Sequence, residues 1–207
     1  MTETFDVDTP FGTGRVDLHV ATRSVGLLVL GHGAGGTVDT ADLVAVRDAA
    51  LAEHLSVALV TQPYRVAGRR SPAPARQLDG AWVAVVEELR ARRRLARLPV
   101  VAGGRSSGAR VACRTASALG VAGVLALAFP LHPPGRPERS RAEELEGAGV
   151  PCLVLQGERD SFGKPDELPA GVPVRPVAGA DHGFARATDL AEAAVEAAVW
   201  ARARATG

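Results

Sequence analysis

The chain has 207 residues, of which 46 % are hydrophobic and 23 % charged, and its formal net charge is +1. This length suits a single domain that spans residues 1–207, with a composition ordinary for a globular protein. A net charge so close to zero argues against a nucleic acid or an anionic membrane as partner. No apolar run approaches the roughly 20 residues that a membrane span needs.

The cysteines and the first residues bear on location. Cys113 and Cys152 both lie inside apolar runs, so we expect buried thiols and no disulfide framework. The first six residues are acidic and lack the apolar stretch of a secretory signal. We therefore expect a cytoplasmic protein.

Strands and helices are predicted to alternate along the chain. Residues 15–20 alternate polar and apolar side chains, which is typical of a half-exposed antiparallel edge strand. Short apolar runs then predict strands at residues 26–30, 57–60, 99–102, 121–129, 152–155 and 174–177. Helical periodicity predicts helices at about residues 39–53, 77–96, 107–118, 142–148 and 188–204. This alternation predicts an α/β fold, with a mostly parallel sheet of about six to seven strands and helices on both faces.

A glycine-rich loop directly follows the strand at residues 26–30, with the sequence Gly31-His32-Gly33-Ala34-Gly35-Gly36. Such a loop brings bare backbone close to a ligand and can donate a hydrogen bond to an oxyanion. We expect the N–H of Ala34 to be this donor, and that of Gly33 less so. His32 is expected to order the loop and to adjoin the substrate. A phosphate cradle is the alternative, but neither a G-x-G-x-x-G pattern nor a P-loop lysine is present.

Residues 104–108 form the one G-x-S-x-G pattern in the chain. The predicted strand at 99–102 runs into it and the helix at 107–118 runs out, as in a nucleophile elbow, where a strained turn projects a serine hydroxyl above the sheet. In this frame Ser106 is the nucleophile, and the backbone N–H of Ser107 is the second oxyanion donor. The alternative is a glycine-rich turn without chemistry.

A serine nucleophile of this kind needs an acid and then a histidine later in the chain. Asp160 follows the strand at 152–155 and is the favoured acid, with Glu158 and Asp166 as rivals. His182 lies between the last predicted strand and the last helix, and is the favoured base. Asp181 is adjacent to this histidine, so we expect it to stabilise the loop instead.

Three other histidines and the later loops complete the candidate site. His19 and His54 are expected to be ordinary residues, whereas His132 precedes Asp160 and is expected only to line the pocket. The connection between residues 129 and 141 holds four prolines and is too short for a cap domain. We therefore expect an open, shallow site rimmed by Leu131, His132 and Tyr64. The chain lacks H-E-x-x-H and C-x-x-C patterns, so neither a metal nor a cofactor is expected.

These motifs together resemble the α/β-hydrolase superfamily and its dienelactone-hydrolase-like branch, and more closely the family of testis-expressed protein 30 and the hydrolase-like domain of an NSL chromatin-complex subunit. The resemblance spans Gly31 to His182 and rests on the segments 31–36, 103–110, 129–135 and 156–163 and on His182. It implies an α/β-hydrolase fold. Dienelactone hydrolases carry a cysteine nucleophile, whereas this chain has serine. Some members of the closer family act as parts of protein complexes, so a retained triad does not by itself imply turnover.

Three functions follow as hypotheses. The first is a serine hydrolase that cleaves a small ester, thioester or lactone through an acyl-enzyme, with a small-molecule substrate as its partner and a monomeric or homodimeric state. The second is a catalytically silent binding or scaffold module. The third is a nucleic-acid binder, suggested by an arginine cluster that is better explained as a solvated helix end. The cluster consists of Arg90, Arg92, Arg93, Arg94 and Arg97.

Overall fold

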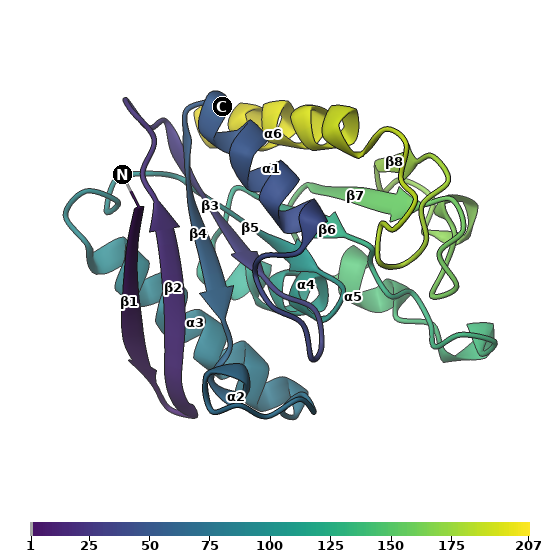
Figure 1. Cartoon of the computed structure of the whole chain (residues 1–207), viewed down its shortest axis with the longest axis horizontal. Helices are drawn as coiled ribbons and strands as arrows, with labels where there is room; N and C mark the ends of the chain where they lie inside the picture. The colour runs from purple at the N-terminus through teal and green to yellow at the C-terminus, as the bar shows by residue number, and fades with distance from the viewer. Residues whose placement is uncertain (1) are drawn as a thin grey trace.

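The computed structural model describes residues 2–207, whose strands form one eight-stranded sheet in the order β1-β2-β4-β3-β5-β6-β7-β8 (Figure 1). β1 (Thr2–Thr9) pairs antiparallel with β2 (Gly12–His19), which pairs antiparallel with β4 (Leu55–Thr61). All other neighbours are parallel. These remaining strands are β3 (Gly26–Gly31), β5 (Val100–Arg105), β6 (Gly123–Leu127), β7 (Cys152–Gly157) and β8 (Val174–Val177). The mostly parallel sheet confirms the predicted α/β fold.

Helices cover both faces of this sheet, as predicted (Figure 1). One face packs against α1 (Ala41–Ala52) and α6 (Leu190–Thr206). The opposite face packs against α3 (Ala75–Ala91), α4 (Ser107–Leu119) and α5 (Ala142–Glu146). A short helix that the sequence did not predict, α2 (Pro63–Val66), follows β4 directly.

The face that α6 presents to the sheet consists of alanines. Its buried residues are Ala193, Ala194, Ala197, Ala198, Ala201 and Ala205. A Cβ placed on Gly26 would lie 2.5 Å from the Cβ of Ala205, so the helix and the start of β3 approach at backbone distance. Small side chains therefore set the spacing of this layer.

The edge of the sheet differs from the prediction. The sequence predicted β2 as the edge strand. In the structure β1 is the edge strand, and β2 lies between β1 and β4. β1 was missed because six of its eight residues are Thr, Asp or Glu, and only Phe5 and Val7 mark its inner face. The sheet therefore has eight strands instead of six to seven.

The connection after β6 carries no cap domain. It runs from Leu127 to α5 and contains one short 3-10 helix, η1 (Pro137–Arg139). Among residues 2–207, no helix is long and apolar enough to cross a membrane.

Candidate active site

Ser106 occupies a strained turn between β5 and α4. Its backbone angles are φ 51° and ψ −108°, a conformation that costs a non-glycine residue energy. The surrounding glycines make the turn possible, because a Cβ on Gly104 or Gly108 would lie 2.5 or 2.4 Å from the carbonyl oxygen of Gly31. The backbone N–H of Ser106 is anchored on the carbonyl of Leu127 at 2.8 Å. The strand–turn–helix arrangement thus raises the serine hydroxyl above the carboxyl end of β5.

His182 and Asp160 meet this serine from two later loops. His182 Nε2 lies 3.0 Å from Ser106 Oγ, and His182 Nδ1 lies 2.8 Å from Asp160 Oδ2. The Asp160 residue is only 1 % exposed, whereas the His182 side chain keeps 20 % of its surface exposed. When Nδ1–H donates to the carboxylate, Nε2 is free to accept the serine proton. Three residues that are far apart in sequence therefore form one hydrogen-bonded chain, called here the Ser–His–Asp chain.

Two neighbours fix the Asp160 carboxylate. Gln156 Nε2 donates to Oδ2 at 3.0 Å, and the backbone N–H of Phe162 donates to Oδ1 at 2.8 Å. The same amide group of Gln156, which is fully buried, also donates to the carbonyls of Phe129 and Gly163. Each oxygen of the buried carboxylate therefore has a donor besides the histidine, and these donors fix its orientation.

The rival acids have other roles. Glu158 accepts the backbone N–H of Gly179 at 3.0 Å. Asp181 Oδ1 accepts the N–H groups of Gly183 and Ala185, so it stabilises the loop as predicted. Asp166 lies in a short 3-10 helix, η2 (Pro165–Glu167).

His182, the predicted base, is held by contacts that the sequence did not indicate. The ring of Phe162 stacks on that of His182, with centroids 4.1 Å apart and planes inclined by 30°. Arg105 Nη2 donates to the backbone carbonyl of His182 at 2.9 Å. Gln156 could have been suspected, since it is the one polar side chain in the apolar strand β7. Nothing in the sequence pairs Phe162 or Arg105 with a residue of a distant loop.

The two predicted oxyanion donors have backbone N–H groups without an acceptor among the described residues. Ser107 is the first residue of α4, and Ala34 lies in the turn after β3. The loop adjoins the serine, because a Cβ on Gly33 would lie 3.6 Å from the Cβ of Ser106. Free amides beside the predicted nucleophile are what an oxyanion hole would require, and their role stays a prediction.

His32 and Tyr64 hold the glycine-rich loop after β3 in place through hydrogen bonds. His32 donates from Nδ1 to the carbonyl of Gly33 at 2.7 Å and accepts the N–H of Gln62 at Nε2 at 3.1 Å. The Tyr64 hydroxyl accepts the N–H of Gly35 at 3.3 Å. Burial lowers the pKa of His32 and raises that of Tyr64, so both stay neutral near pH 7.

The open rim predicted from the sequence is not formed by the side chains proposed for it. Tyr64, Leu131 and His132, which were predicted to form the rim, are all buried, and so is His32, which was predicted to adjoin the substrate. Leu131 packs under Gly163, and the backbone N–H of His132 donates to the carbonyl of Phe162 at 3.0 Å. These residues support the loops that surround Ser106 instead of standing exposed at its mouth. Direct contact between them and a substrate stays a prediction.

Metal ligands do not gather at this site. Across residues 2–207, His, Cys, Asp and Glu side chains form no group of three or more that could hold a metal ion.

The alpha/beta hydrolase domain family matches residues 24–205. The chain belongs to this family. No curated protein sequence matches this chain. The finer resemblance to the testis-expressed protein 30 family stays a prediction.

Solved structures share the fold of this alpha/beta hydrolase domain at low sequence identity. A serine hydrolase homologue from Coxiella burnetii is 18 % identical with a TM-score of 0.77, over 95 % of this chain and 97 % of that one. A serine hydrolase without lid from Xanthomonas campestris is 20 % identical with a TM-score of 0.74, over 96 % and 94 % of the chains. A dienelactone hydrolase from Anabaena variabilis is 17 % identical with a TM-score of 0.77, over 97 % and 96 %.

Proposed function

We propose that this alpha/beta hydrolase domain is a serine hydrolase that cleaves small carboxylic esters, thioesters or lactones through an acyl-enzyme. The observation that carries the proposal is the unbroken Ser–His–Asp chain, with contacts of 3.0 and 2.8 Å. The fold similarity to proteins described as serine hydrolases adds support at the level of reaction class.

The proposed reaction begins at the hydroxyl of Ser106. Its oxygen attacks the substrate carbonyl while the proton passes to Nε2 of His182, and Asp160 stabilises the resulting imidazolium. The negative charge on the tetrahedral intermediate is received by the backbone N–H groups of Ala34 and Ser107. As the intermediate collapses, His182 returns the proton to the leaving oxygen or sulfur, and Ser106 keeps the acyl group.

Deacylation repeats these roles with water in place of the serine. His182 takes a proton from a water molecule, the hydroxide attacks the acyl carbonyl, and the proton returns to Ser106 as the carboxylic acid leaves. No cap domain covers the site, and an open site favours small substrates, so we propose substrates with short acyl groups. Rising activity on longer acyl esters would contradict this part.

The test compares Ser106→Ala with Ser107→Ala. Both remove one hydroxyl, but Ser107 contributes only its backbone N–H in this proposal, so Ser107→Ala should keep labelling by a fluorophosphonate probe and hydrolysis of short p-nitrophenyl esters. Ser106→Ala should abolish both. If the wild-type protein neither reacts with the probe nor hydrolyses esters, thioesters or lactones, the domain is a silent binding module.

A further inference from the structure

A cavity lies at the end of the sheet opposite Ser106. It has a volume of about 140 Å³ and is lined by residues of β1, by the end of β2 with Val20 just after it, and by the turn after α3. On β2, His19 pairs with Val57 near the start of β4, whereas Ser106 follows the last residue of β5. The cavity therefore belongs to the amino-terminal ends of the parallel strands. Its lining residues are Glu3, Leu18, Val20, Arg92, Arg93, Arg94 and Leu95.

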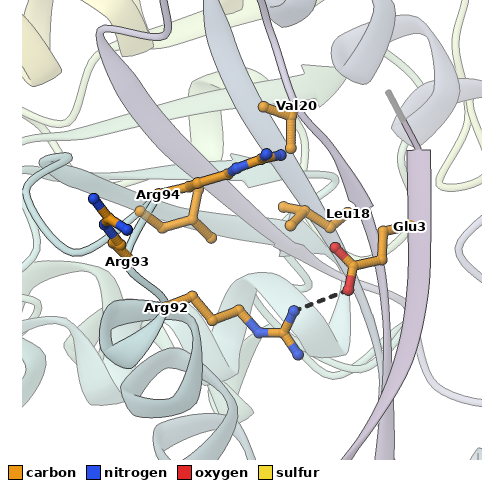
Figure 2. A pocket seen from close by; sticks show the side chains of 7 residues that line it. Glu3, Leu18, Val20, Arg92, Arg93 and Arg94 are labelled. Atoms are coloured by element: carbon orange, nitrogen blue, oxygen red, sulfur yellow. Dashed lines mark hydrogen bonds and ion pairs between the residues drawn. The ribbon is translucent and has the colours of Figure 1, made fainter.

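The floor of this cavity is apolar and its rim is charged. Leu18 and Leu95 are buried, at 3 % and 2 % exposure, and the half-buried Val20 adjoins them. Figure 2 shows the side chains of Arg94 and Arg92 on opposite sides of Leu18, with Glu3 beyond it. A ligand here would bury an apolar part against the leucines and present a charged group to the arginines.

Arg92 is committed to contacts within the protein. Its Nη1 pairs with Glu3 at 3.1 Å, its Nε lies 3.5 Å from Glu88, and its guanidinium sits 3.3 Å from the centroid of the Phe5 ring. These contacts neutralise its charge and fix its position. Arg92 is therefore a wall of the cavity and not a free cation.

Arg93 and Arg94 are different, because their side chains form no hydrogen bond or ion pair with any residue from 2 to 207. Both are exposed. They are presented by an ordered turn, since the carbonyl of Arg92 accepts the N–H groups of Leu95 and Ala96 at 2.8 and 2.9 Å. Two unpaired guanidiniums on a fixed turn lose little backbone freedom when they bind an anion.

We propose that this cavity binds a small monocarboxylate whose apolar part is a single ring or a short alkyl chain. Guanidinium groups match a carboxylate with paired N–H donors. A cavity of about 150 Å³ is known to admit one benzene ring, so the volume here suits a part of that size. The Glu3 carboxylate on the rim disfavours a dianion more than a monoanion. This site is separate from the proposed hydrolase site and goes beyond it.

The test measures the binding of sodium benzoate by methyl NMR on the wild-type protein. Benzoate should shift the methyl signals of Leu18, Val20 and Leu95 in a saturable way. Benzamide, which has the same ring without the charge, should bind at least tenfold more weakly. The double substitution Arg93→Gln/Arg94→Gln should raise the Kd for benzoate at least tenfold.

Arg97→Gln is the matched control, because Arg97 is an exposed arginine of the same segment that does not line the cavity. It should leave the benzoate Kd within twofold. Equal affinities for benzoate and benzamide would overturn the proposal, as would shifts confined to methyl groups near Ser106. A random oligonucleotide gives a further test. If the protein binds it, and if Arg97→Gln weakens that binding as much as Arg93→Gln or Arg94→Gln does, the arginines form a diffuse basic surface and the proposal is overturned.

Discussion

Arg105 donates a hydrogen bond to the backbone carbonyl of His182, and its Nε lies 3.2 Å from Asp42 Oδ2. Asp42 belongs to the first turn of α1 and its side chain is 2 % exposed. The guanidinium also borders the glycine-rich loop, since a Cβ on Gly33 would lie 2.9 Å from Arg105 Nη1. Arg105, the residue before Ser106, thus connects the loop that carries His182, the glycine-rich loop after β3 and α1.

We expect Arg105→Met to lower kcat by about 10- to 100-fold, because the carbonyl of His182 loses its donor and small misplacements of catalytic groups are costly. The substitution also leaves the buried Asp42 carboxylate unpaired, which should lower the free energy of unfolding by about 3 kcal/mol. Steady-state hydrolysis of p-nitrophenyl acetate and urea unfolding measure the two effects.

The double variant Arg105→Met/Asp42→Asn separates these effects. Removal of the carboxylate charge should recover most of the lost stability but not the lost kcat, because His182 still lacks its donor. If kcat recovers together with stability, Arg105 acts only through the fold and does not position the base.

Asp160→Asn should lower kcat about 10³- to 10⁴-fold with little change in KM. The carboxylate accepts a hydrogen bond from Nδ1–H of His182 and stabilises the imidazolium, and an amide does neither as well. Glu158→Gln is the control, because the Glu158 carboxylate accepts the N–H of Gly179 in the adjacent loop. Its kcat should stay within twofold of wild type. Comparable losses in the two variants would reopen the assignment of the acid.

Gly108→Ala should destabilise the protein by about 3 kcal/mol or more, since the new methyl would meet the carbonyl oxygen of Gly31 at 2.4 Å. Alanine is otherwise the better helix residue by about 1 kcal/mol, so a loss would come from this clash and from the neighbouring one with the carbonyl oxygen of His32 at 2.9 Å. Gly68→Ala is the comparison, with open space around it and a cost of about 1–2 kcal/mol from its φ of 76°. Urea unfolding of both variants gives the ranking, and a Gly108→Ala protein as stable as Gly68→Ala would contradict it.

Acidification below pH 6.5 should weaken the fold through His32. Burial lowers the pKa of this histidine below its ordinary value of 6.5, so the unfolded chain binds a proton at a pH where the folded protein does not. Stability is therefore full above pH 6.5 and declines as the pH falls toward the folded-state pKa. His32→Gln should flatten this part of the curve of unfolding free energy against pH. An unchanged slope in His32→Gln would exclude the mechanism.

The sequence predicted the order of strands and helices because buried parallel strands are continuous apolar runs. The predicted strand at 174–177 has the bounds of β8, and the helix predicted at 107–118 is α4 to within one residue. β1 was not predicted, because a polar edge strand exposes one face and gives a weak hydrophobic pattern. α2 was not predicted, because four residues are too few to show a helical period.

The candidate site, like the fold, was predictable from the sequence only in part. Ser106, Asp160 and His182 could be named from motifs and chain order, because the fold places the ends of its strands at one edge. Their supporting contacts could not, since the stacking of Phe162 on His182 depends on how two loops pack. The buried positions of Tyr64 and Leu131 were missed for the same reason: a residue after a strand can turn inward or outward, and only packing decides.

The short connection between β6 and α5 has a chemical consequence for the second half of the proposed cycle. With no domain folded over it, the His182 side chain keeps one-fifth of its surface in contact with bulk solvent. In the proposed cycle, bulk water can then reach the acylated serine, so a dilute alcohol or amine would compete poorly for the acyl group. Under that proposal the exposed site favours release of a free acid over transfer of the acyl group to another molecule.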